Sequence, residues 1–383
     1  MKVILNVDAI TGPLTGIGNY AMQLACGLPK NPNIEDFKLY SSHRWIKDAD
    51  HALKANQTLA SLRKNIPLKG PALKLYTWQK NLWFKNKSKP MNKDYILHSP
   101  NYLLMPFEGP SVTTIHDLSF LRYPETHPKE RVELLEKQLP LSIAQADAII
   151  TDSDYIKTEV QHILGVPEDK IHVVPLGVST NYRPHSEAES TPILKKYNLD
   201  NLKYLLSVAT LEPRKNLNSL IDAYLLLPKK TREEYKLVIV GARGWLSKNL
   251  QHRIEMLVKR GDIISLGYIQ IEDLPHIYSG SSGFVLPSLY EGFGLPLLEA
   301  MAAGIPVLTS TSSSLPEVAA GAAILTNAND IEDISTGMIK LLEDQKWREK
   351  AIQKGLKRAQ KYSWQKCINS TIKVYQHINQ FKQ

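Results

Sequence analysis

The chain has 383 residues, of which 47 are Lys or Arg and 38 are Asp or Glu, so its formal net charge is +9. This length exceeds one ordinary hydrophobic core and suits two domains of about 180 residues each. Hydrophobic residues make up 43% of the chain, which excludes an intrinsically disordered protein. The positive charge favours anionic partners such as nucleotides, lipid headgroups or nucleic acid, without choosing among them.

The sequence predicts neither secretion nor a membrane span. The apolar run at residues 3–7 is too short for a signal peptide and is typical of a buried strand. No window reaches the roughly 20 apolar residues that a transmembrane helix needs. Cys26 and Cys367 have no neighbouring cysteine or histidine cluster, as expected of reduced thiols. We therefore expect a cytoplasmic protein. A peripheral location on the inner face of the cytoplasmic membrane is an alternative.

In the first half of the chain, short apolar runs alternate with amphipathic stretches, a pattern typical of parallel α/β sheets. Two helices are predicted at residues 19–28 and 129–145. Strands are predicted at residues 3–7, 38–40, 96–98, 111–115, 148–151 and 171–174. A polar stretch at residues 180–191 then predicts a linker between the two halves of the chain.

The same alternation restarts after this linker and ends in one more amphipathic helix at residues 363–381. Strands are predicted at residues 204–209, 236–240, 263–266, 283–286, 306–309 and 322–325, and helices at 217–227, 248–260, 274–279, 295–303 and 315–319. The chain is therefore predicted to form two doubly wound Rossmann-like domains. They would span residues 1–183 and 184–362, with the segment 363–383 packing back toward the first. Ligands of such sheets bind at the carboxyl ends of the strands, so we expect a ligand cleft between the two domains.

The most informative motif follows the predicted strand at 283–286. Glu291 lies in a loop with Gly292 and Gly294, which let the backbone approach a ligand closely. A helix begins near Pro296, and its free N–H groups can bind a phosphate. Glu299 lies about one turn inside that helix. The segment therefore offers two carboxylates for sugar hydroxyls and an anion site between them. The simpler alternative is that the two glutamates lie near each other by chance and share no function.

Two further motifs follow predicted strands. Arg214 and Lys215 are adjacent cations after the first strand of the second domain, where they could bind a diphosphate or form a solvated turn. His116 ends the strand at 111–115 and is expected to point into the cleft, although a lone histidine at a strand end is more often structural. Asp117 beside it could position a loop or an acceptor.

The loop after the first strand contains Gly16 and Gly18. They would let the backbone of the first domain approach a sugar or phosphate, or they would only form a tight turn. The spacing differs from the GxGxxG pattern of dinucleotide-binding proteins.

The spacing of Glu291 and Glu299, with seven residues between them, and the following segment 302–307 resemble the family-4 glycosyltransferases of the GT-B fold. The closest resemblance is to bacterial mannosyltransferases of O-antigen and polysaccharide assembly. It implies that Glu291 lies near the donor sugar, that Glu299 binds the nucleotide ribose, and that His116 contacts the sugar. It also implies a first domain for the acceptor and a second for the donor. The donor contacts would come from Gly16, Gly18, Gly292, Phe293, Gly294, Leu295 and Glu299, and the catalytic groups from His116, Glu291, Arg214 and Lys215.

The resemblance implies transfer of a hexose from a nucleotide diphosphate sugar with retention at the anomeric carbon, best matched by mannose from GDP-mannose. The acceptor would be a glycan or a lipid-linked glycan of lipopolysaccharide or polysaccharide assembly. Many relatives carry Gly-Arg after the first strand of the second domain, whereas this chain has Ala209 and Thr210, which puts an extra phosphate-binding Arg in doubt. A UDP-sugar transferase remains an alternative, as do a sugar-nucleotide epimerase, a phosphorylase and a non-catalytic protein that binds membrane or nucleic acid.

Two Asp-x-Asp strings, Asp48 with Asp50 and Asp152 with Asp154, could ligate a metal in another class of glycosyltransferase. The paired glutamates favour a metal-independent mechanism without a cofactor. Residues 61–93 carry nine Lys or Arg, no acidic residue, and interleaved aromatic side chains that include Trp78, Trp83 and Phe84. This composition suits an anionic membrane surface or the basic face of an ordinary helix. A nucleic-acid partner is not expected.

Overall fold

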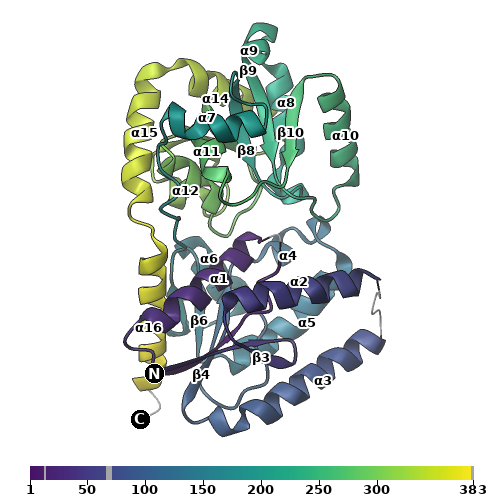
Figure 1. The fold of residues 1–383 in the computed structure, drawn as a ribbon, viewed down its shortest axis with the longest axis vertical. Coiled ribbons are helices and arrows are strands. Elements are labelled where there is room, and N and C mark those ends of the chain that lie inside the picture. Colours follow the sequence, from purple (N-terminus) through teal and green to yellow (C-terminus); the bar gives the residue numbers. More distant parts are fainter. Residues whose placement is uncertain (13, 66–70, 381–383) are drawn as a thin grey trace. The chain divides into compact units, whose positions relative to one another are not determined.

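The computed structural model describes residues 1–12, 14–65 and 71–380, with the side chains of residues 59–78 and 380 excluded. It forms two compact units (Figure 1). The first comprises Met1–Leu118, Glu133–Leu176 and Trp364–Gln383, and the second comprises Ser119–Val132 and Gly177–Ser363. Within the described residues, no helix is long and apolar enough to cross a membrane.

The first unit is built on a seven-stranded sheet in the order β3-β2-β1-β4-β5-β6-β7. Every neighbouring pair is parallel except β2 with β3. Because helices cover both faces, β4, β5 and β6 are buried along their whole length. The strands are β1 (Lys2–Asn6), β2 (Asp36–Ser41), β3 (Arg44–Ile46), β4 (Tyr95–Ser99), β5 (Ser111–Ile115), β6 (Ala148–Thr151) and β7 (Ile171–Val173). The longer helices whose residues belong mainly to this unit are α1 (Gly16–Gly27), α2 (Ala49–Asn65), α3 (Pro71–Ser88), α5 (Lys129–Gln145), α6 (Asp154–Leu164) and α16 (Trp364–Gln380).

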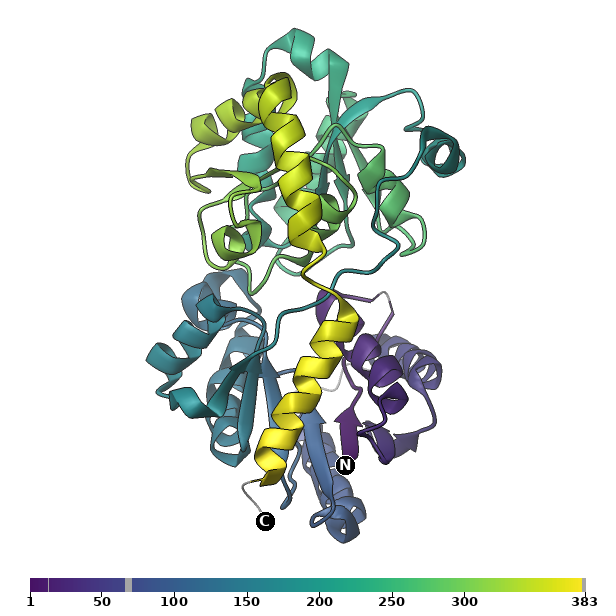
Figure 2. The same cartoon turned by 90° about the vertical axis from the view of Figure 1, so that its left-hand side faces the viewer.

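The C-terminal helix α16 belongs to the first unit although it follows the second in sequence. Figure 2 shows it running beside the strands of the first unit, and it contacts α1 and β6. Tyr375 hydrogen-bonds His98 Nδ1 at 2.7 Å, and His98 Nε2 lies 2.9 Å from the Thr114 hydroxyl. Burial lowers the pKa of His98 to about 3, so the ring is neutral and can donate at one nitrogen and accept at the other. This buried network fixes α16 to β4 and β5.

The second unit contains a parallel six-stranded sheet in the order β10-β9-β8-β11-β12-β13. Its core joins apolar residues of the sheet to those of α8 and α14, including Leu205, Ile239, Tyr224 and Met338. The strands are β8 (Lys203–Val208), β9 (Tyr235–Val240), β10 (Ile263–Gly267), β11 (Gly283–Leu286), β12 (Val307–Ser310) and β13 (Ala323–Thr326). The helices are α4 (Ser119–Arg122), α7 (Glu187–Lys196), α8 (Leu217–Leu226), α9 (Lys229–Glu234), α10 (Lys248–Lys259), α11 (Leu274–Ser279), α12 (Leu295–Ala302), α13 (Leu315–Ala319), α14 (Ile331–Glu343) and α15 (Gln345–Ala359).

A short segment that includes the start of α5 packs in the second unit. The Trp245 indole donates to the carbonyl of Thr126 at 2.8 Å, and the guanidinium of Arg131 lies over its ring at 5.6 Å. The segment 119–132 is therefore part of the second unit although its neighbours in sequence belong to the first.

The predicted linker at 180–191 is only partly correct, because α7 begins inside it at Glu187. The Ser186 hydroxyl accepts from the Glu189 amide at 3.3 Å, and the Glu189 carboxylate accepts from the Ser186 amide at 2.8 Å. This reciprocal pair is a capping box, which starts a helix in a segment that its polar composition had assigned to a loop.

Candidate functional site

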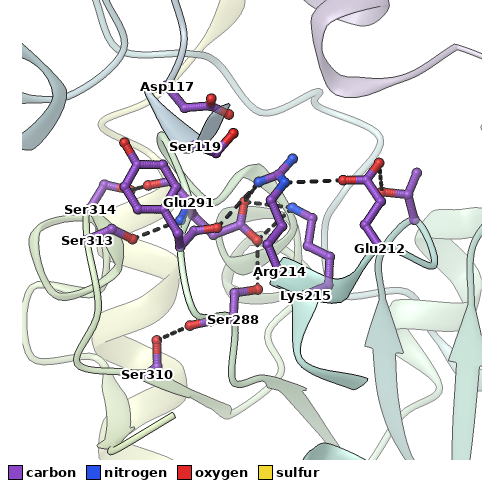
Figure 3. A network of polar contacts seen from close by, with 12 residues as sticks. Asp117, Ser119, Glu212, Arg214, Lys215, Ser288, Glu291, Ser310, Ser313 and Ser314 are labelled. Atoms are coloured by element: carbon purple, nitrogen blue, oxygen red, sulfur yellow. Dashed lines mark hydrogen bonds and ion pairs between the residues drawn. The ribbon is translucent and has the colours of Figure 1, made fainter. Parts of the chain in front are cut away.

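The two charged motifs of the second unit meet at the Glu291 carboxylate. Lys215 ends a short 3₁₀ turn (Pro213–Lys215) after β8, and Glu291 lies in the loop after β11. Since β8 and β11 are parallel neighbours, their carboxyl ends adjoin. Lys215 Nζ lies 2.7 Å from both carboxylate oxygens of Glu291, and the Ser288 hydroxyl donates to Oε1 at 2.8 Å (Figure 3).

Arg214 points toward the same group beside Lys215 (Figure 3). Its Nη1 lies 3.7 Å from Glu291 Oε2 and 3.3 Å from the carbonyl oxygen of Tyr290, and its Nε donates to Glu212 Oε2 at 3.2 Å. Glu212 is buried and was not predicted as part of the site. Its place two residues before Arg214, just after a strand, was the available signal.

Glu291 is ionised although its side chain is only 7% exposed. Burial raises the pKa of this carboxyl, but Lys215 and then Arg214 outweigh burial and bring the pKa below its ordinary value. The two cations therefore surround one buried carboxylate, and the cluster contains two positive charges and two negative charges when Glu212 is included.

The predicted anion site begins at α12. Gly294 precedes the helix with a φ of +94°, and a Cβ there would lie 2.8 Å from a methyl group of Leu315. Both features favour glycine. Pro296 occupies the first turn of α12, where its missing N–H costs nothing. Phe293 packs edge-on against Tyr362 at 5.6 Å, which fixes the loop before the helix. Leu295 is the first residue of α12.

Glu299 lies in the second turn of α12 and faces two tyrosines. The Tyr278 hydroxyl donates to Glu299 Oε2 at 3.0 Å, and Tyr182 packs edge-on against Tyr278 at 5.5 Å. Burial raises the pKa of Glu299 to about 7, and hydrogen bonds from Tyr278 and Tyr182 oppose that rise. The two glutamates thus differ in charge near neutral pH. Neither tyrosine was predicted from sequence.

The candidate residues of the first unit lie at the carboxyl edge of its sheet and at the start of α1. His116 follows β5 and is buried, with Nδ1 2.7 Å from Asp152 Oδ2 and Nε2 2.9 Å from the Pro100 carbonyl oxygen. Gly18 is buried, and a Cβ there would lie 2.9 Å from the carbonyl oxygen of Ala9. Gly16 is exposed, and a Cβ there would meet nothing within 4 Å. Close packing therefore explains Gly18 but not Gly16.

Comparison with known proteins identifies the family. Residues 15–182 match the model "Glycosyltransferase Family 4", and residues 190–358 match "Glycosyl transferases group 1". The chain is 40% identical to O-antigen chain mannosyltransferase B of Escherichia coli over 98% of its own length and 99% of that protein. The chain belongs to the family 4 glycosyltransferases.

Solved structures confirm the predicted GT-B fold. Sucrose-phosphate synthase from Thermosynechococcus elongatus superposes with a TM-score of 0.74 at 20% identity, covering 99% of both chains. Anabaena HepE in complex with UDP-glucose gives a TM-score of 0.72 at 14% identity, covering 98% of this chain and 100% of that one. At these identities the likeness extends to the fold alone.

In this glycosyltransferase the two Asp-x-Asp strings do not pair their carboxylates. Asp152 is buried against His116, whereas Asp154 is exposed at the start of α6. Asp48 accepts from the backbone and ring of His51. Within the part of the chain that the structure describes, no three His, Cys, Asp or Glu side chains are grouped to hold a metal ion.

The predicted basic stretch of the glycosyltransferase forms the end of α2, α3 and the turn that follows. Residues 66–70, and the side chains of residues 61–78, Trp78 among them, lie outside the described part. Phe84 was expected at a membrane interface, and this is wrong: it is completely buried among Ile4, Tyr40 and Leu97. Its ring fills the core on one face of the first sheet.

The pKa of Glu299 leads to a pH prediction for donor binding. If the Glu299 carboxylate accepts the ribose hydroxyls, binding favours its ionised form, so the donor dissociation constant should rise as pH falls below about 7. Above that pH it should level off. Titration calorimetry with a nucleotide diphosphate sugar, whose esterified phosphates do not titrate there, would measure the change. Glu299→Gln should bind more weakly and lose this pH dependence. An unchanged slope in the variant would assign the titration to another group.

Proposed function

We propose that this glycosyltransferase moves mannose from GDP-mannose, with retention of anomeric configuration, onto a glycan acceptor of O-antigen or related polysaccharide assembly. The observation that carries this proposal is the 40% identity, over nearly the full length of both chains, to an O-antigen chain mannosyltransferase. The charged cluster around Glu291 and the start of α12 support a nucleotide diphosphate sugar as the donor.

Charge balance explains how the cluster can serve a diphosphate. A lone carboxylate at Glu291 would repel an anionic donor, but Lys215 lies 2.7 Å from both of its oxygens and neutralises it. Arg214, 3.7 Å from the same carboxylate, adds a second cation, and Glu212 balances it at 3.2 Å, so the cluster as a whole does not repel an anion. As the bond between the anomeric carbon and the diphosphate oxygen breaks, negative charge grows on the leaving oxygen, and fixed cations stabilise it more than the ground state.

The acceptor hydroxyl attacks the anomeric carbon on the face that the diphosphate leaves. The electron pair of the breaking bond goes to the diphosphate oxygen, and the hydroxyl proton passes to that departing group. The mannosyl group is thereby transferred with retained configuration. In this scheme Glu291 lies beside the sugar, Glu299 binds the ribose, and the start of α12 binds the diphosphate.

A donor panel tests this assignment. We expect GDP-mannose to bind at least tenfold more tightly than UDP-glucose or ADP-glucose in titration calorimetry, and its transfer product to carry the same anomeric configuration as the donor by NMR. UDP-glucose is the relevant competitor because the structure of Anabaena HepE, which shares the fold, was solved in complex with UDP-glucose. Preference for a UDP-sugar would replace the donor assignment, and a product of inverted configuration would refute the mechanism.

We further propose that the acceptor is lipid-linked and that the basic end of α3 contacts an anionic membrane. Trp83 is half-buried, and Lys87 Nζ lies over its ring, 5.0 Å from the ring centroid. Four lysines are exposed at the end of α3 and in the segment just after it: Lys85, Lys87, Lys89 and Lys93. Each such charge contributes about 1 kcal/mol near an anionic surface and is screened by salt.

Vesicle sedimentation would test this contact. Binding should increase with the fraction of anionic lipid, decrease with salt, and weaken when the four lysines are replaced by Gln. A matched variant removes four exposed lysines of α15 instead, namely Lys346, Lys350, Lys354 and Lys357. Equal loss in both variants would mean that net charge, not α3, drives binding. No sedimentation of the wild type at low salt would refute the contact.

A further inference from the structure

Three neighbouring strands of the first sheet each contribute one polar group to a single buried cluster. Pro100 follows β4, His116 follows β5 and Asp152 follows β6, and these strands are adjacent in the order β4-β5-β6. The imidazole lies in the middle, 2.7 Å from a carboxylate oxygen at Nδ1 and 2.9 Å from a carbonyl oxygen at Nε2. The edge of Tyr20 packs against the ring at 5.1 Å and nearly perpendicular to it.

Hydrogen-bond chemistry determines where the protons of this cluster lie. A backbone carbonyl can only accept, so Nε2 of His116 must carry a hydrogen that it donates to Pro100. The carboxylate of Asp152 also accepts, so a second hydrogen lies on the line between Nδ1 and Oδ2. A neutral imidazole has one N–H and could satisfy only one of these two acceptors. With Asp152 ionised, the ring donates on both sides, as an imidazolium paired with a carboxylate, whereas a neutral Asp152 carboxyl would donate to Nδ1 of a neutral ring.

The surroundings make each member of the pair depend on the other. His116 is 6% exposed and Asp152 is 2% exposed, and Asp152 Oδ1 has no hydrogen-bond partner among the described residues. An unpaired charge in this setting would be costly, so the two charges are retained together. Burial lowers the pKa of His116, but Asp152 outweighs it and raises the pKa above its ordinary value, with Asp117 adding to the rise.

Other titratable groups act on the pair from the elements packed around it. Asp117, next in sequence, adds negative charge near both partners. The remaining groups are Tyr20 on α1, His98 on β4 and Cys367 on α16. Burial keeps all three of these uncharged near neutral pH, because it raises the pKa of Tyr20 and Cys367 and lowers that of His98. The Asp carboxylates are therefore the groups that favour a charged ring.

We propose that Asp152 is a positioning residue that holds His116 as a fixed, doubly protonated ring during sugar transfer. This rests on the proposed function and on the role that the family resemblance implies for His116, a contact with the donor sugar. Neither ring nitrogen is available to take the proton of the acceptor hydroxyl. The pair is neutral overall and presents an oriented imidazolium held by a carboxylate, and the departing diphosphate accepts the proton.

The variant Asp152→Asn removes the negative charge at this position while it preserves the packing of the side chain. Asparagine has nearly the same volume, and its amide can donate to Nδ1 while Nε2 still donates to Pro100, so a neutral ring fits the same place. We expect turnover to fall by about 10²-fold, the order of one preorganised charge contact, with little change in the KM for the donor. Ring ¹⁵N NMR should show both nitrogens of His116 protonated at pH 8 in the wild type and only one in the variant.

The control Asp154→Asn makes the same chemical change two residues away at an exposed position and should leave turnover and the ring signals unchanged. A singly protonated His116 in the wild type at pH 8 would overturn the proposal, even if the variant fails to fold. So would turnover of Asp152→Asn within about twofold of wild type. His116→Gln tests the proposed function separately: normal turnover there would remove His116 from the reaction, while the NMR result would still decide the protonation of the pair.

Discussion

Replacement of Lys215 by Met is expected to lower turnover by about 10²- to 10³-fold, the loss typical of one preorganised charge contact at a transition state. The ammonium group is the cation nearest to Glu291, and in the proposed reaction it stabilises the leaving diphosphate. Arg214→Met should lower turnover by the same order. Steady-state kinetics with saturating donor would measure both effects.

The same change in Lys215 should also destabilise the fold. Its position in a turn would suggest little effect on stability. The structure, however, places Lys215 in a buried ion pair with Glu291, and their side chains are only 11% and 7% exposed. Removing one partner of such a pair costs about 3–5 kcal/mol, because the other charge is left buried. The double variant of Lys215→Met with Glu291→Gln should recover part of the unfolding free energy without recovering activity.

An exposed ion pair of the same chemistry provides the control. Lys203 bonds Glu234 at 2.7 Å, but their side chains are 61% and 45% exposed. Lys203→Met should therefore change the unfolding free energy by no more than about 1 kcal/mol and leave turnover unchanged. If Lys215→Met kept near-normal turnover and lost only stability, Lys215 would be a structural partner of Glu291 and the proposed phosphate contact would be wrong.

The strands could be predicted from sequence because a strand buried on both faces must be apolar along its length. Each of the twelve predicted runs forms a strand within two residues of its expected bounds. Among the described residues, the strand that was missed is β3, which has three residues, is partly exposed, and pairs with β2 through a turn in which Ser42 has a φ of +57°. The helices α2, α6, α14 and α15 were not among those predicted, whereas a helix at α3 was one interpretation of the basic stretch.

The site was predictable as separate motifs but not as a set of contacts. Arg214, Lys215, Glu291 and Glu299 stand out because charged residues follow apolar strands. The ion pair between Lys215 and Glu291 forms because β8 lies beside β11, which follows it by 75 residues in the chain. No local sequence pattern predicts this order of strands in the sheet. The same holds for the contact of Glu299 with Tyr278 and for that of His116 with Asp152.

The two glutamates of the motif are expected to give different kinetic defects when each is changed to Gln. Glu291→Gln preserves volume but removes the charge beside the proposed sugar site, where positive charge develops as the anomeric bond breaks. Its effect should therefore appear mainly in kcat, lowered by about 10²-fold, with the donor KM unchanged or reduced because Lys215 is released toward the diphosphate.

Glu299→Gln should mainly raise the donor dissociation constant, since a ribose contact is present equally in the ground state and the transition state. The environments of the two residues support this division. Glu291 is held ionised by two cations, which suits a group that must be charged throughout the reaction. Glu299 has a pKa raised to about 7 and is bound by tyrosine hydroxyls, so it can exchange those partners for ribose hydroxyls when the donor binds. Steady-state kinetics combined with calorimetry on both variants measures the two effects separately. Matching losses in kcat and in donor affinity for the two variants would show that the glutamates act as one unit, and would contradict the proposed roles.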